Sequence, residues 1–279
     1  MDAVDRKSMQ ERGLNVLARH KGGFQFTNTF FPYTSGEIGP YYVQSGVVQN
    51  DGHDYNGAID DMSELVRSAV GEKRVGGIII SGGETRDWIF SLPVALKLYR
   101  PHVMLYNDGK MVGASGEIKG REVVHVADLN NEGSSPRDKW VPIIKKAEGT
   151  IRDIFFYVDR MEGGVDVVKD LGLNSHAVVP LDEHAWDYLQ KTGVVSAEVY
   201  RNLMARGKSQ ADRDEWAEAM LKSRAGQSEL VKLFDNEKSR EKVRKILSHG
   251  YAYLKSELLD VLKRESRSGL DVGEWAEGM

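Results

Sequence analysis

The chain has 279 residues, of which 41% are hydrophobic and 29% charged, and its formal net charge is −4. This length and composition predict a globular α/β domain with an appendage, and the weak negative charge gives no electrostatic reason to expect nucleic acid or a membrane as a partner. The sequence has no cysteine, which excludes disulfides and thiolate metal sites and is typical of a cytoplasmic protein.

The N-terminal stretch predicts a docking helix followed by two strands. Residues 1–20 repeat apolar positions with a helical period and carry many charges, so we expect neither a signal peptide nor a membrane span there. The aromatic and β-branched residues 24–32 predict a strand. A turn with glycine and proline then places Tyr41 and Tyr42 on opposite faces of a second strand, where a core role and a ligand contact are both open interpretations.

Residues 50–56 are polar and predict a solvated loop before a helix over 57–70. The loop contains Asp51, His53 and Asp54, which are residue types that bind metals. No further carboxylates continue a ligand pattern, however, so the sequence favours a solvated turn over a metal site.

The central part of the chain alternates apolar runs with helical periods. The runs at 76–80, 101–106, 123–127, 151–158 and 176–180 are the predicted strands, with helices over 89–99, after 135 and over 165–171. This alternation predicts right-handed βαβ units and a mainly parallel sheet flanked by helices.

Three polar loops with glycine follow the predicted strands, at residues 81–88, 128–135 and 159–164. In a parallel sheet these loops share the carboxyl edge, where backbone N–H groups and helix N-termini hold anionic ligands. Arg86 is expected either to contact a phosphate or to pair with Asp87 or Glu84. Asp128 is expected either to contact a ligand or to cap the following turn. His125 lies three residues from Asp128 on an extended segment, so the two are not expected to form a metal pair.

Residues 107–120 are polar and rich in glycine and predict one long, mobile loop. From Val194 onward only helical periods occur, and Ser196, Ser209 and Ser228 are predicted N-caps. We therefore predict an α/β domain over residues 1–192 and an all-helical appendage over residues 193–279.

Three motifs in this order resemble those of the orotate phosphoribosyltransferases, which belong to the type I phosphoribosyltransferase family. Residues 34–42 read TSGEIGPYY and resemble Lys-Ser-Gly-x-x-Ser-Pro-aromatic-aromatic. Residues 123–135 read VVHVADLNNEGSS and resemble four apolar residues, two acids, a spacer and Thr-Thr-Gly. Residues 158–164 read VDRMEGG and are similar to Asp-Arg-x-Glu-x-Gly. The resemblance spans roughly residues 24 to 190.

This resemblance implies transfer of ribose 5-phosphate from phosphoribosyl pyrophosphate (PRPP) to orotate or a related base, a step of pyrimidine biosynthesis. It also implies Mg²⁺ bound through PRPP rather than by direct protein ligands, and a homodimer in which residues 107–120 close over the substrate. The resemblance assigns catalytic roles to Lys110 and Asp128. It assigns substrate contacts to Tyr41, Tyr42, Ser81, Gly82, Gly83, Arg86, Asn131, Glu132, Gly133, Ser134, Ser135 and Arg160.

The sequence also departs from this family at charged positions. Where that family has basic side chains, this chain has Thr34, Tyr106, Asn107 and Val112. Ala127 replaces an acid. Glu132 lies in the loop expected to hold the 5′-phosphate, where two like charges about 4 Å apart repel by about 4 kcal/mol at an effective dielectric near 20.

Two interpretations remain open: a transferase with altered anion contacts, or a non-catalytic ligand-binding or regulatory protein that keeps Arg160. A Rossmann-type protein is disfavoured because no G-x-G-x-x-G follows a first strand.

Overall fold

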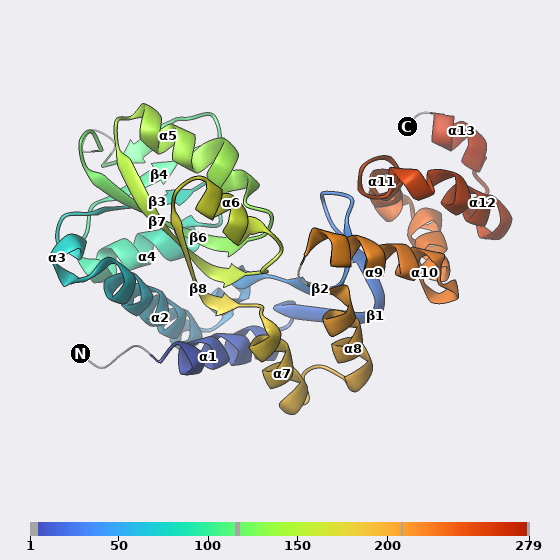
Figure 1. Ribbon diagram of the computed structural model, residues 1–279, viewed down its shortest axis with the longest axis horizontal. Helices are drawn as coiled ribbons and strands as arrows, with labels where there is room; N and C mark the ends of the chain where they lie inside the picture. Colours follow the sequence, from blue (N-terminus) through green and yellow to red (C-terminus); the bar gives the residue numbers. More distant parts are fainter. Residues whose placement is uncertain (1–4, 115–117, 208, 278–279) are drawn as a thin grey trace. The chain divides into compact units, whose positions relative to one another are not determined.

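The computed structural model describes residues 5–114, 118–207 and 209–277. The chain forms two compact units (Figure 1), one of Met1–Phe24 with Val43–Val194 and the other of Gln25–Tyr42 with Val195–Met279. Each unit has its own core. The predicted division into domains at residues 192 and 193 stays a prediction.

The first unit contains a six-stranded sheet in the order β5-β4-β3-β6-β7-β8. Its strands are β3 (Ile79–Gly83), β4 (His102–Leu105), β5 (Met111–Gly113), β6 (Glu122–Asn130), β7 (Thr150–Asp159) and β8 (Asn174–Pro180). Every neighbouring pair is parallel except β4 with β5. The predicted mainly parallel sheet is therefore confirmed, with the bounds of each predicted strand shifted by one to a few residues.

Strand β5 lies inside the segment that the sequence predicts to be one irregular loop. A tight turn explains the difference: Tyr106 N–H donates to the Lys110 carbonyl at 2.9 Å, and Gly109 takes a φ of 87°, which glycine adopts without strain. The chain then pairs antiparallel with β4, with Val112 opposite Met104. The rest of the predicted mobile loop includes residues 115–117, which lie outside the described residues.

Helices cover both faces of this sheet, which is why its central strands are apolar on both sides. Figure 1 shows α1, α2 and α4 on one face and α5 and α6 on the other. The helices are α1 (Arg6–Arg19), α2 (Gly52–Val70), α3 (Glu72–Val75), α4 (Trp88–Leu98), α5 (Val141–Lys146), α6 (Gly164–Asp170) and α7 (Glu183–Lys191). On β7 the fully buried Phe156 belongs to the core beneath α5, whereas its neighbour Tyr157 stacks on Phe90 of α4.

The start of α2 corrects the predicted loop at residues 50–56. Asp51 is the N-cap, and its carboxylate accepts hydrogen bonds from the backbone N–H groups of His53 and Asp54 at 2.8 and 3.1 Å. These bonds satisfy donors that a helix end leaves without partners, so the helix begins at Gly52 despite its polar first turn.

The second unit combines a hairpin with the C-terminal helices. The hairpin consists of β1 (Phe24–Pro32) and β2 (Ile38–Val43), and the helices are α8 (Ala197–Arg206), α9 (Gln210–Lys222), α10 (Arg224–Asp235), α11 (Glu237–Lys245), α12 (Lys255–Glu265) and α13 (Val272–Glu277). Phe30 and Ile38 of the hairpin share a core with Trp216 and Phe234 of the helices. The predicted caps Ser196 and Ser209 are confirmed.

The third predicted cap, Ser228, is wrong because Ser223 caps α10 and accepts from Gly226 N–H at 3.0 Å. None of the helices in the described part of the chain is long and apolar enough to span a membrane.

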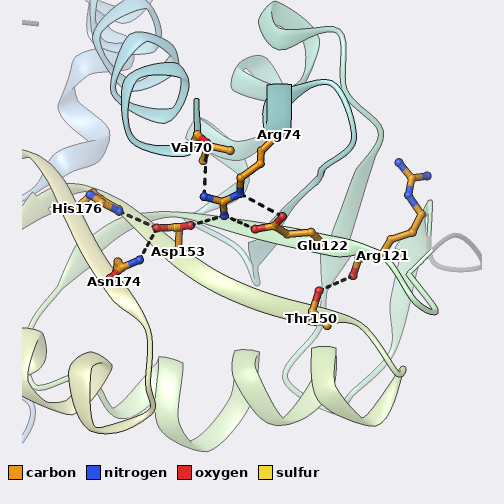
Figure 2. Close-up of polar contacts among 8 residues, drawn as sticks. All are labelled: Val70, Arg74, Arg121, Glu122, Thr150, Asp153, Asn174 and His176. Carbon is orange, nitrogen blue, oxygen red and sulfur yellow. Dashed lines mark hydrogen bonds and ion pairs between the residues drawn. The ribbon is translucent and has the colours of Figure 1, made fainter. Parts of the chain in front are cut away.

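A partly buried ionic network ties the amino ends of the strands to α3 (Figure 2). Arg74 of α3 pairs with Glu122 and donates to Asp153 at 2.9 Å. The other oxygen of Asp153 accepts from Asn174 and His176 of β8, each at 3.0 Å. The side chain of Asp153 is only 3% exposed, so this edge of the sheet is held by a carboxylate with three donors.

Candidate functional site

The three predicted loops meet at the carboxyl edge of the sheet. Strands β3, β6 and β7 are parallel to one another, so the residues that follow Gly83, Asn130 and Asp159 leave the sheet at the same edge. The prediction that these loops share one edge is therefore confirmed. Ser81, Gly82 and Gly83 are themselves the buried last residues of β3, and the first loop begins at Glu84.

A pair of carboxyl groups, one buried on Asp87 and one half-buried on Asp128, joins the first two loops. Asp87 accepts hydrogen bonds from the backbone N–H groups of Gly83 at 2.9 Å and Asp128 at 3.0 Å, and its carboxyl group hydrogen-bonds to that of Asp128. Asp128 also accepts from the hydroxyl of Ser45 at 3.0 Å. Asp128 therefore does not cap the turn that follows it but contacts the neighbouring strand-to-helix loop.

The protonation of this pair follows from its burial. Desolvation raises the pKa of Asp87 to about 7 and the pKa of Asp128 to about 7, and the charge of Asp87 adds to the effect on Asp128. Two carboxyl groups in contact cannot both ionise easily, so near neutral pH the pair shares a proton and carries about one negative charge. Such a pair can donate and accept hydrogen bonds at once.

His125 lies directly below the carboxyl pair on β6 and is fully buried. Its Nδ1 is 2.9 Å from the hydroxyl of Ser81, and its ring stacks on Trp140 at a centroid distance of 4.1 Å. Burial lowers the pKa of His125 to about 3, so the ring is neutral. Its Nε2 lies 3.5 Å from Asp87 Oδ2. Within residues 5–114, 118–207 and 209–277, no three His, Cys, Asp or Glu side chains are grouped to hold a metal ion.

Arg86 supplies an exposed positive charge beside this pair. Although burial dominates the pKa of Asp128, the charge of Arg86 favours its ionised form. Of the two open interpretations, the ion pair with Asp87 or Glu84 is not formed among the described residues. Glu84 instead accepts from the backbone N–H of Asn107 at 2.9 Å, and Asp87 is engaged by Asp128.

Lys110 lies in the turn between β4 and β5, near the loop that carries Arg86. Its Nζ is 5.6 Å from the centroid of the Tyr106 ring, and that ring contacts Trp88 edge-on at 5.1 Å. Lys139 donates to the side chain of Asn107 at 2.8 Å, so a second lysine binds the same turn.

Several groups that would form an anion cradle after β3 are used within the protein. The N–H of Gly83 donates to Asp87, and the N–H of Glu84 donates to the Leu105 carbonyl at 2.9 Å. The hydroxyl of Ser81 contacts His125. This loop therefore offers fewer backbone donors to a pyrophosphate than its glycines suggest.

The loop after β6 is closed by contacts with the start of α6. The carbonyl of Asn131 accepts from Gly164 N–H at 3.1 Å, and Gly133, with a φ of 73°, packs so closely on Val167 that a Cβ would lie 2.7 Å from the Val167 side chain. Ser134 and Ser135 begin the next helix, with Ser134 exposed. Glu132 is half-buried, and its charge acts on Arg137, which pairs mainly with Asp138 at 2.8 Å.

The arginine predicted to contact a base is buried in an ion pair. Arg160 is 8% exposed and donates to Glu162 at 3.0 Å, and Glu162 is only 4% exposed. Tyr41 and Tyr42 belong to the second unit, where the Tyr41 carbonyl accepts from the hydroxyl of Tyr33 at 2.7 Å and Tyr42 is half-buried.

Asp87 and Ser45 are site residues that the sequence did not indicate. The sequence indicates Asp87 only as a partner of Arg86, and Ser45 lies just after the motif at residues 34–42 without being part of it. The signal available for Asp87 is its position immediately before the apolar helix that begins at Trp88, where a capping carboxylate is expected, although this one accepts from Gly83 and Asp128 instead.

No family model matches the chain. The orotate phosphoribosyltransferase of Sulfolobus acidocaldarius is 24% identical over 157 residues, which cover 55% of this chain and 76% of that protein. The orotate phosphoribosyltransferase of Saccharolobus solfataricus is 26% identical over 157 residues, with the same coverage of 55% and 76%.

Solved structures are also similar to this chain. Orotate phosphoribosyltransferase from Aeropyrum pernix has a TM-score of 0.52 at 21% identity and covers 65% of this chain and 99% of that one. Leishmania donovani UMP synthase has a TM-score of 0.59 at 16% identity and covers 72% of this chain and 42% of that one.

The parallel sheet, its two layers of helices and the loops at its carboxyl edge form the type I phosphoribosyltransferase fold. Within that class the chain is orotate phosphoribosyltransferase-like, a distant homologue of enzymes to which it is about 24% identical.

Proposed function

We propose that this protein binds a pentose phosphate or nucleoside monophosphate at the carboxyl edge of the sheet and does not transfer ribose 5-phosphate from PRPP. The observation that carries this proposal is the contact between the buried Asp87 and the half-buried Asp128, whose backbone N–H donates to Asp87. A carboxyl pair with a shared proton donates to and accepts from the vicinal hydroxyls of a ribose. Arg86, exposed beside Asp128, supplies a charge for a phosphate.

Transfer from PRPP places stronger demands on the site, because pyrophosphate leaves with several negative charges that need cations and backbone donors. In this chain the N–H groups of Gly83 and Glu84 are already bonded within the protein. The charge of the carboxyl pair also opposes a pyrophosphate close to it. Mg²⁺ is expected here only as a companion of PRPP, since a pair that retains a proton is a poor resident site for a cation that requires ionised oxygens.

A second candidate is the orotate phosphoribosyltransferase reaction itself. It is favoured by the position of Lys110, which contacts Tyr106 close to the loop of Arg86, so that two cations could replace the missing basic side chains. The homodimer and the cytoplasmic location that the resemblance implies stay predictions.

Calorimetry separates the two candidates. At neutral pH we expect ribose 5-phosphate or orotidine monophosphate to bind at least about tenfold more tightly than PRPP with Mg²⁺, a difference of about 1.4 kcal/mol. Asp128→Ala should abolish this binding, whereas Asp170→Ala on the exposed end of α6 should not change it. Loss of orotate with release of pyrophosphate in the presence of PRPP and Mg²⁺ would establish the transferase instead.

Replacing Glu132 with threonine tests the phosphate loop separately. If the proposal is correct, Glu132→Thr leaves PRPP affinity within about twofold of the parent, because the carboxyl pair and the engaged amides of the first loop still disfavour pyrophosphate. Glu183→Thr, at an exposed helix start, is the matched control. A tenfold gain in PRPP affinity for Glu132→Thr alone would show that this side chain is the main barrier to PRPP.

A further inference from the structure

A cavity of about 360 Å³ lies between α1 and α2, away from the loops at the carboxyl edge. Figure 1 shows the two helices side by side on one face of the sheet. Val16 and Ala58 form apolar walls, and Tyr157 of β7 lines the cavity together with Gly13 and Gly57. Its volume lies within the range of small-molecule sites in proteins.

Two ion pairs bracket the cavity. Arg12 of α1 pairs with Asp61 of α2 at 2.6 Å, and Arg19 of α1 pairs with Asp54 of α2 at 2.6 Å. On each helix the two charged residues are seven positions apart, which is about 10 Å along a helix axis. The helices run antiparallel, and the two ion pairs lie at opposite ends of the cavity. Both charges at each end are matched, and the cavity therefore favours an uncharged occupant.

The hydroxyl of Tyr157 has no hydrogen-bond partner in the part of the chain that the structure describes. The residue is 1% exposed, its ring stacks on Phe90 at 4.8 Å, and its oxygen lies 3.5 Å from the position of a Cβ on Gly13. Burial raises the pKa of Tyr157, with the nearby charges of Asp61 and Asp54 adding to the effect, so the hydroxyl remains a donor. The hydroxyl is not among the buried atoms that lack a partner, so it reaches the cavity and can donate to a molecule bound there.

Asn15 of α1 lines the same cavity and is exposed. Its amide N–H donates to the hydroxyl of Tyr188 at 2.8 Å. A side-chain amide also has a second N–H and a carbonyl oxygen, so a molecule with a carbonyl and an N–H can bond to both Tyr157 and Asn15.

The shape of the cavity depends on two glycines. At Gly13 a Cβ would lie 2.3 Å from Val179, so this glycine lets α1 approach the sheet. At Gly57 a Cβ would meet nothing within 4 Å, and the missing side chain leaves the cavity open. A larger residue at position 57 would fill this space without displacing its neighbours.

We propose that this cavity is a binding site for an uncharged aromatic or cyclic amide, with its carbonyl on the hydroxyl of Tyr157 and its ring between Val16 and Ala58. The site is separate from the one under "Proposed function" and does not depend on it.

Benzamide is the probe, compared with benzoate and benzamidine, which have the same shape but carry opposite charges. Titration followed by NMR should show saturable benzamide binding with a Kd on the order of 1 mM, the range expected of so small a ligand. Benzoate and benzamidine should bind at least about fivefold more weakly. No saturation by benzamide up to about twenty times that concentration, or tighter binding of either ion, would overturn the proposal.

Two variants connect the binding to this cavity. Tyr157→Phe should weaken benzamide binding about fivefold, the typical effect of one hydrogen bond, without lowering the melting temperature, because the hydroxyl it removes has no partner among the described residues. Tyr99→Phe, at a residue 84% exposed that follows the last residue of α4, is its control.

Gly57→Leu should abolish binding, whereas Gly52→Leu at the start of the same helix should leave it unchanged. Benzamide affinity that is the same in the parent, Tyr157→Phe and Gly57→Leu would show that the ligand binds elsewhere and that the proposal is wrong.

Discussion

Replacing Asp153 with alanine is expected to lower the free energy of unfolding by about 2 to 3 kcal/mol, since hydrogen bonds to a charged group contribute about 1.5 to 3 kcal/mol and the partner Arg74 is itself 37% exposed. The carboxylate accepts from Arg74, Asn174 and His176 (Figure 2), and without it the guanidinium of Arg74 keeps only Glu122 as a charged partner. Denaturant unfolding at pH 7 measures the effect. The matched control is Asp170→Ala on an exposed surface, which should change stability by less than about 0.5 kcal/mol.

The same network predicts a loss of stability in acid. Burial alone would raise the pKa of Asp153, but hydrogen bonds from His176, Asn174 and Arg74 lower it to about 2, from 3.8 in the unfolded chain. A depressed folded pKa gives stability that is complete above the unfolded value and disappears as pH falls through the folded value. The difference in stability between the parent and Asp153→Ala should therefore shrink below pH 3.8. An unchanged difference down to pH 2 would contradict this account.

The carboxyl pair at the other edge is expected to give the opposite pH dependence. Its folded pKa values are about 7, above the unfolded value of 3.8, so the folded protein holds a proton that the unfolded chain has released. Stability from this pair is therefore present below pH 3.8 and is lost as pH rises through about 7. At about 1.4 kcal/mol per pH unit for one proton, the loss approaches about 4 kcal/mol.

Asp87→Asn tests this dependence because the amide keeps the shape of the side chain and removes one titrating group. Because both oxygens of Asp87 accept backbone N–H groups, the amide loses one acceptor and the variant should be less stable than the parent near pH 4. Between pH 4 and pH 8, however, its free energy of unfolding should fall less steeply than that of the parent. Asp170→Asn should retain the slope of the parent. Parallel stability curves for Asp87→Asn and the parent would show that the pair is ionised throughout and that its raised pKa values are wrong.

The order of strands and helices in the first unit was predictable from the sequence because the strands of that unit are apolar on both faces. Runs such as Val123 to Val126 can be buried only in a sheet covered by helices, so the order of strands and loops follows from pattern alone. Boundaries were less predictable. A single cap at Asp51 turned an expected loop into helix, and a glycine turn at Gly109 turned part of another into a strand.

The candidate site was predictable in position but not in chemistry. The loops at 81–88 and 128–135 placed Arg86 and Asp128 at one edge, yet the partner of Asp128 proved to be Asp87, the neighbour of the residue expected to contact a ligand. A contact between two loops depends on which strands are neighbours in the sheet. A local stretch of sequence does not reveal that pairing. The same holds for the hairpin of Gln25–Tyr42, whose Ile38 N–H donates to the hydroxyl of Tyr251 far along the chain.

The network around Asp153 lies at the amino ends of strands whose carboxyl ends carry the loops of the site. The contacts that stabilise the sheet are therefore separate from the side chains of the candidate site. A substitution in the loops at the carboxyl edge leaves the partners of Asp153 in place, so the chemistry of the site can change without loss of the fold.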